Sequence, residues 1–125
     1  MSKVITLDET RAVETPAATM LTYASPTTPT VAPVAVWRTS MGPKVSGPLH
    51  SIDTDHVVVV LDGALVAEID DVESVVDAGE CVILPAGVIR KLTAGPAGVV
   101  TLTSALPGSK AALGDSEPVS VPWAN

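Results

Sequence analysis

The sequence predicts a single all-β domain, and three observations support that prediction. The chain has 125 residues, enough to bury a core of its own, and 46% of them are hydrophobic against 17% charged. Valine, a β-branched residue that favours strands, dominates the apolar set, and phenylalanine is absent. From residue 34 onward, short apolar runs separated by turn residues recur about every ten residues, which is typical of a β-sandwich or barrel.

The first 33 residues are expected to form an extended N-terminal arm that packs on the domain. Three prolines between Thr15 and Thr30 rule out a long helix. Residues 19–23 are the best strand candidate of the arm, and residues 8–13 form a short turn at most.

The compact region, residues 34–107, holds the remaining strands. We expect them at residues 34–38, 56–61, 64–69, 72–76, 80–84, 88–92 and 99–104. Three turn sequences predict antiparallel hairpins, namely Asp62-Gly63, Asp70-Asp71 and residues 77–79. The tail, residues 108–125, is too irregular for a further strand, and Trp123 after Pro122 is expected to anchor it.

Residues 57–61 are apolar on both faces, although a barrel strand with one side in water should alternate. Their outer face therefore needs a cover, for which residues 17–25 of the arm and a second subunit of a homodimer are two alternatives. The single cysteine, Cys81, lies in an apolar run and is expected to be a buried core thiol.

The charge pattern excludes several classes of partner. The net charge is −7, and the seven basic residues are scattered, so nucleic acid is not expected to bind. No apolar run reaches the length of a signal peptide or a membrane span. We therefore expect a cytoplasmic protein without a membrane partner.

Two segments of the chain carry a regular spacing of histidine, glycine and proline. The first contains His50 and His56, the only histidines of the chain, and ends at Gly63. The second is framed by Gly79, Pro85 and Gly87. In these spacings, residues 47–94 resemble the two motifs of the cupin family. The resemblance implies a double-stranded β-helix, or jelly-roll barrel.

The residues at the metal-ligand positions of the family motifs have changed. His50 matches the first histidine, Ile52 replaces the second, His56 stands at the position of the glutamate, and Arg90 replaces the third histidine. Isoleucine offers no ligand atom and arginine repels a cation, whereas a catalytic metal usually has three protein ligands. We therefore expect no cofactor, and a divalent transition metal at His50 and His56 is the less favoured alternative.

The even spacing of residues 50, 52, 56, 58 and 60 places their side chains on one face of unbroken strands. In the family frame that face is the barrel interior, with Arg90 pointing inward and Lys91 outward. The expected catalytic residues are His50, His56 and Arg90. The expected ligand-binding residues are Trp37, Ile52, Asp55, Val58, Val60 and Val88.

Several of these residues have alternative roles. His50 and His56 are expected either to act on a ligand or to be core or mouth histidines held by backbone groups. A buried arginine needs a partner, and Arg90 is expected either to pair with Asp53 or Asp55 or to receive an anionic or carbonyl end of a ligand. Trp37 is expected either to line the floor of the cavity or to be plain core.

These features predict a metal-independent enzyme of an isomerase, cyclase or dehydratase type, which acts on a small organic molecule in an apolar cavity. The histidines would transfer protons and Arg90 would stabilise an oxyanion. The resemblance adds an association with secondary metabolism and polyketide cyclases. The alternatives are a non-catalytic ligand-binding cupin and a residual metal-dependent oxygenase or lyase, for which Asp53 or Asp55 would complete the ligand set.

Overall fold

The computed structural model describes residues 3–125 and contains ten strands and two short 3-10 helices in that part of the chain. In chain order the elements are η1 (Leu7–Glu9), β1 (Arg11–Glu14), β2 (Thr19–Ala24), β3 (Ala35–Met41), β4 (Ser51–Ile52), β5 (His56–Ile69), β6 (Val72–Asp77), β7 (Cys81–Leu84), β8 (Arg90–Ala105), β9 (Lys110–Ala112), β10 (Val119–Ser120) and η2 (Pro122–Ala124). The predicted all-β barrel with an N-terminal arm is confirmed. None of the helices among these residues could cross a bilayer.

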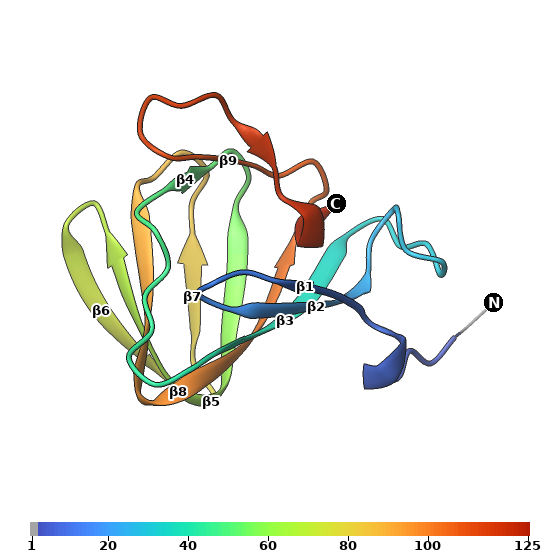
Figure 1. The fold of residues 1–125 in the computed structure, drawn as a ribbon, viewed down its shortest axis with the longest axis horizontal. Coiled ribbons are helices and arrows are strands. Elements are labelled where there is room, and N and C mark those ends of the chain that lie inside the picture. Colours follow the sequence, from blue (N-terminus) through green and yellow to red (C-terminus); the bar gives the residue numbers. More distant parts are fainter. Residues whose placement is uncertain (1–2) are drawn as a thin grey trace.

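One large sheet forms the wall of the barrel, and a small sheet lies at one of its ends. The large sheet has the order β1-β2-β3-β8-β5-β6, and β7 also pairs with β5. The small sheet has the order β10-β9-β4. Figure 1 shows β4 and β9 at the top of the barrel, together with the loop that leads to the C-terminus, whereas β5 and β8 bend at the bottom.

The strands β5 and β8 are longer than the sequence predicts. Asp62 and Gly63 do not make a hairpin, because β5 continues through them and pairs with β8 on both sides. The register shifts there, and Gly63 has a φ of 74°, so the glycine serves a bulge at which the strand bends. Residues 90–92 of the predicted strand at 88–92, and the whole predicted strand at 99–104, likewise belong to the single strand β8, which begins at Arg90.

The other two predicted turns have different outcomes. Asp70 and Asp71 form the predicted tight hairpin, with φ values of 48° and 68°, between β5 and β6. Residues 77–79 form no hairpin, because β6 and β7 do not pair with each other. Both pair with β5, one along each half of that strand.

The N-terminal arm contains the predicted strand and one more. β2 covers residues 19–23 as expected and pairs with β3, and β1 pairs with β2 at the edge of the sheet. The arm therefore extends the sheet and does not cover residues 57–61, of which Val57 is 39% and Leu61 44% exposed. Cover by residues 17–25 is thus wrong.

Two clusters of buried side chains make up the core. The first joins the arm, β3 and the tail, and it consists of Met20, Ala35, Trp37, Ile52, Ala105, Val121 and Ala124. The second fills the bent part of the barrel, and it consists of Val58, Val60, Leu65, Val76, Leu84, Ala94 and Val99. Cys81 is exposed, so its predicted burial is wrong: on β7 the side chains of Val82 and Leu84 point inward, and Cys81 alternates with them.

Candidate functional site

A cavity of about 690 Å³ lies inside the barrel. Its wall is mostly apolar, and it is formed by the inner face of the large sheet, by β4 and by parts of the tail. Six of the predicted site residues line it, namely Trp37, His50, Ile52, His56, Val58 and Arg90. The structure therefore brings both histidines and the arginine to one cavity.

Three predicted ligand-binding residues do not line this cavity. Asp55 is exposed and its Oδ1 accepts a hydrogen bond of 2.7 Å from the backbone nitrogen of Ala86. Val60 points inward as its spacing predicts, but it is completely buried within the second core cluster. Val88 lies in the connection before β8, outside the wall of the cavity.

Arg90 is the first residue of β8, and its side chain is 1% exposed. Its Nη2 lies 3.4 Å from Nδ1 of His56, and neither Nε nor Nη1 has a hydrogen-bond acceptor among residues 3–125. Burial lowers the pKa of Arg90 to about 10, so the guanidinium still carries its charge at neutral pH.

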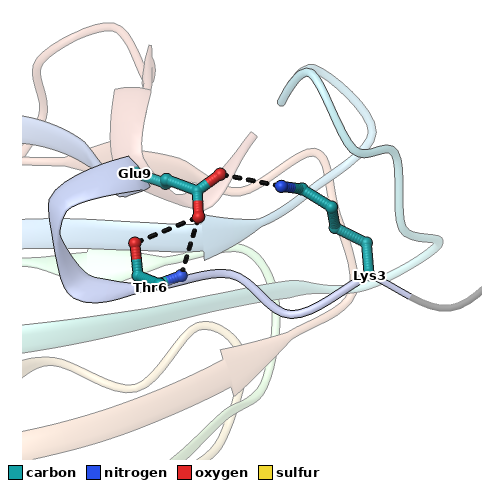
Figure 2. A network of polar contacts seen from close by, with 3 residues as sticks. All are labelled: Lys3, Thr6 and Glu9. Atoms are coloured by element: carbon teal, nitrogen blue, oxygen red, sulfur yellow. Dashed lines mark hydrogen bonds and ion pairs between the residues drawn. The ribbon is translucent and has the colours of Figure 1, made fainter.

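No carboxylate pairs with Arg90 in the described part of the chain, and the expected bridge to Asp53 or Asp55 is wrong. Asp53 accepts a hydrogen bond of 2.7 Å from the backbone nitrogen of Lys110, and Asp55 is bonded to Ala86 as described above. Both aspartates therefore hold backbone groups of neighbouring loops. The ion pair that residues 3–125 do contain joins Lys3 and Glu9 at 2.9 Å in the N-terminal arm, beside Thr6 (Figure 2).

His56 is the first residue of β5 and is 4% exposed. Its Nε2 lies 3.2 Å from Oγ of Ser109, and its ring meets that of Trp37 edge-on, with 5.2 Å between the ring centroids. Burial, and then the charges of Arg90 and a protonated His50, lower the pKa of His56 to about 4, although Asp53 and Asp55 act in the opposite direction. His56 is therefore neutral at pH 7.

His50 is half-buried, and its backbone pairs with that of Arg90 through N–O distances of 2.9 and 2.8 Å. Its Nδ1 lies 2.7 Å from the carbonyl oxygen of Pro48. Because a carbonyl only accepts, Nδ1 carries the proton and Nε2 of the neutral ring carries the lone pair. Burial lowers the pKa of His50 and the charge of Arg90 adds to that, while the bond to Pro48 acts against both.

The side chains at this site do not fit a divalent metal ion. No three histidine, cysteine or acidic side chains within residues 3–125 come together as a ligand set. The guanidinium of Arg90 lies beside His56 and would repel a cation, and Asp53 and Asp55 hold backbone amides. A residual site at His50 and His56 would thus have to displace existing contacts.

Several residues of the cavity wall were not predicted. Leu65 and Leu84 face inward at positions that strand alternation could have identified. By contrast, no local pattern places residues 15–18 of the arm or Val121 and Trp123 of the tail against the cavity. Trp37 combines its two expected roles, since it lines the cavity and belongs to the first core cluster.

The tail is tied to the arm by hydrogen bonds. The hydroxyl of Thr22 donates to the carbonyl oxygen of Trp123 at 2.8 Å, and the guanidinium of Arg11 donates to that of Asn125 at 2.7 Å. The side-chain amide of Asn125 donates to the carbonyl oxygen of Val121, also at 2.7 Å. These bonds hold η2 against the barrel, and they agree with the expected anchoring near Trp123.

Comparison with solved structures identifies the fold. A sugar phosphate isomerase of the cupin superfamily from Silicibacter pomeroyi DSS-3 has a TM-score of 0.71 and 20% identity, over 91% of this chain and 83% of its own. The polyketide cyclase RemF from Streptomyces resistomycificus has a TM-score of 0.72 and 22% identity, over 87% and 84%. Oxalate decarboxylase from Bacillus subtilis has a TM-score of 0.70 and 15% identity, over 85% of this chain but 30% of its own.

No protein-family model and no curated protein sequence matches the chain. At these identities the solved structures establish the fold, which is that of the cupins, as the two half-motifs predict. The three proteins have different activities, so the fold by itself does not select one of them.

Proposed function

We propose that this cupin-fold chain is a metal-independent enzyme that moves a proton on a small, largely apolar organic substrate, in an isomerisation, cyclisation or dehydration. The observation that carries the proposal is the buried guanidinium of Arg90, which has two nitrogens without an acceptor among residues 3–125 and lines the same cavity as His50 and His56. A role in secondary metabolism belongs to the same proposal, on the analogy with the polyketide cyclase.

The chemistry assigns a role to each group. Nε2 of His50 takes a proton from a carbon beside a carbonyl group of the substrate, and the electrons of the broken C–H bond form an enolate. The enolate oxygen is stabilised by N–H groups of Arg90, whose charge is strong in a cavity with apolar walls. The protonated His50 then returns its proton to another carbon, or to a leaving hydroxyl group.

The first experiment identifies the ligand. Small molecules that co-purify with the protein are determined by mass spectrometry, and the compound found is incubated with the enzyme in deuterated water. We expect His50-dependent incorporation of deuterium next to the carbonyl group. His50→Ala is expected to lower kcat by about 10²-fold or more, the usual size of a general acid–base contribution. His56→Ala should lower kcat as well, because the guanidinium of Arg90 then loses its side-chain partner.

The matched control is Lys91→Met, which removes a neighbouring cation of β8 but leaves Arg90 in place. Its kcat should remain that of the unmodified protein. An unchanged rate in His50→Ala would exclude proton transfer by this residue. Stoichiometric metal in protein purified without added metal, together with loss of activity on chelation, would exclude the metal-independent mechanism.

A non-catalytic binding protein is the second candidate, and one observation favours it: both ring nitrogens of His56 are already engaged by protein groups. The same cavity would then bind an anionic or carbonyl ligand without turning it over. Binding of the co-purified compound without any exchange of deuterium would favour this candidate.

A further inference from the structure

Behind Arg90, four side chains form a continuous hydrogen-bonded chain. Nη2 of Arg90 lies 3.4 Å from Nδ1 of His56, and Nε2 of His56 lies 3.2 Å from Oγ of Ser109. That hydroxyl lies in turn 2.6 Å from Oγ1 of Thr54. Ser109 is completely buried. The four residues come from the starts of β5 and β8 and from the loops that precede β5 and β9.

Only one direction of proton donation satisfies every member of this chain. A guanidinium can only donate, so Nδ1 of His56 must carry a lone pair. The neutral ring then has its proton on Nε2 and donates it to Ser109. The hydroxyl proton of the completely buried Ser109 then has Oγ1 of Thr54 as its remaining side-chain acceptor among residues 3–125, so Ser109 donates to Thr54. The direction is therefore set at one end by the permanent charge of Arg90.

We infer that Ser109 is a positioning residue, which fixes the tautomer and the ring orientation of His56 and through it the guanidinium of Arg90. With Nη2 held by His56, Nε and Nη1 of Arg90 stay available for an anionic oxygen of the ligand. His56 then holds Arg90 and does not itself transfer the proton, which is left to His50. This inference rests on the proposed function of Arg90.

The tail supplies the rigid support for Ser109. The carbonyl oxygen of Ser109 accepts hydrogen bonds from the backbone nitrogen of Val121 at 3.0 Å and from the side-chain amide of Asn125 at 3.2 Å. These bonds involve the backbone of Ser109 and remain when its hydroxyl is removed. Ser109→Ala should therefore keep the fold and change only the hydrogen-bonded chain.

The test is nitrogen NMR of the histidine rings and of the arginine Nε–H group at pH 7. In the unmodified protein we expect His56 to be protonated on Nε2 and not on Nδ1. In Ser109→Ala we expect a mixture of His56 tautomers or a mobile ring. Exchange of the Arg90 Nε proton with water should become roughly two- to tenfold faster, the equivalent of one net hydrogen bond.

Two further variants make the result specific. Thr54→Val keeps the size of the side chain and the hydroxyl of Ser109, and it should produce a smaller change in the same two signals. Ser46→Ala removes a hydroxyl that also lines the cavity but bonds to Thr93, so it should change neither signal. If Ser109→Ala does not fold, the His56 and Arg90 signals of Thr54→Val are compared with those of Ser46→Ala. A change in Thr54→Val alone would support the inference, and equal signals in the two variants would contradict it.

A His56 ring protonated on Nδ1 in the unmodified protein would overturn the inference. So would a Ser109→Ala protein whose His56 and Arg90 signals match those of Ser46→Ala. Both readouts are independent of turnover. Failure of the proposed function, seen as unchanged kcat in His50→Ala, would leave them intact.

Discussion

The charged guanidinium of Arg90 is buried in the barrel and has no acidic partner in the described part of the chain. The one polar side chain that it contacts there is the neutral imidazole of His56. A buried charge of this kind opposes folding by several kcal/mol, because the loss of hydration is not offset by a nearby opposite charge. A side chain that opposes folding is expected to serve a ligand. The stability of variants at this position therefore tests its role.

Arg90→Met is expected to leave the free energy of unfolding unchanged or to raise it. The variant removes the desolvated charge and keeps the volume, and this gain offsets the cost of about 1–3 kcal/mol for leaving Nδ1 of His56 without a donor. Urea unfolding monitored by tryptophan fluorescence measures the change, with Lys91→Met as the control. A loss of more than about 3 kcal/mol would instead identify Arg90 as half of a structural ion pair.

His56 predicts a dependence of stability on pH. Its pKa is lowered from 6.5 to about 4 in the folded protein, so between these values the unfolded chain binds more protons. The contribution is fully present above pH 6.5 and is lost as the pH falls through this window, by about 2 kcal/mol at pH 5. His50 acts in the same direction, because its pKa is lowered as well.

The measurement is the free energy of unfolding in urea at pH 7 and pH 5. In His56→Gln the fall between these values should be smaller, with the part due to His50 remaining. A fall of the same size in His56→Gln and in the unmodified protein would show that His56 does not contribute.

At the scale of elements, the bends of β5 and β8 determine the shape of the cavity. Gly63 has a φ of 74°, and a Cβ atom there would overlap the carbonyl oxygen of Gly98 on β8. On either side of the bend, Gly63 of β5 pairs with Val99 of β8 and Leu65 of β5 pairs with Ala94 of β8. The four residues 95–98 of β8 therefore have a single residue of β5, Ala64, opposite them. The two long strands therefore bend where Gly63 approaches Gly98 too closely to leave space for a Cβ atom on Gly63.

Gly63→Ala and Gly79→Ala form a matched pair for this bend. Gly79 also has a positive φ, 88°, but a Cβ atom there would meet nothing within 4 Å. Gly79→Ala should lower the free energy of unfolding by about 1–2 kcal/mol, the cost of the left-handed conformation alone. Gly63→Ala should lower it by at least about 2 kcal/mol more, because the backbone of β8 must move.

Urea unfolding of both variants provides the comparison. Equal losses would mean that the close approach of Gly63 and Gly98 relaxes without cost. The bend would then require only the left-handed backbone conformation of residue 63, and not the absence of a side chain where β5 approaches β8.

At the scale of the whole molecule, the outer face of the large sheet leaves apolar side chains in water. Ile83 on β7 is 61% exposed and pairs with Val57 on β5, which is 39% exposed, and Leu61 lies further along the same strand. The arm extends the far side of this sheet and does not reach these residues. A second copy of the chain remains the expected cover.

We expect the protein to be a homodimer, and Ile83→Asp to make it a monomer, since a buried unpaired carboxylate strongly disfavours association. Size-exclusion chromatography with light scattering measures the mass of each. Val75→Asp is the control, because Val75 is 64% exposed but lies on β6, which pairs with the other half of β5. A monomeric unmodified protein would contradict the expectation.

Much of the inner face of the barrel could be predicted from the sequence. Alternation puts Val58 on the same face as both histidines and puts Arg90 and Lys91 on opposite faces, and the resemblance to the cupin motifs implies that Val58 and Arg90 point inward. These features depend on the two-residue period of a strand, which each segment carries by itself. The exposure of Cys81 follows from the same period, because Cys81 alternates with the inward-facing Val82 and Leu84, whereas the apolar character of the run alone predicts burial.

What each of these residues contacts was decided by the tertiary structure. Asp62 and Gly63 have the sequence of a hairpin, yet the pairing of β5 with β8 over its whole length makes them a bend. The family motif makes Asp53 and Asp55 the nearest acidic candidates for a bond to Arg90. In the structure each aspartate accepts a hydrogen bond from a loop amide, and the guanidinium contacts His56 instead. Ser109 reaches His56 only because the tail closes over the barrel. The sequence by itself thus determined that the two histidines, Val58 and Arg90 face the cavity, because strand alternation is local and the family frame says which face points inward. Their partners follow from the register between distant strands, which only the folded chain defines.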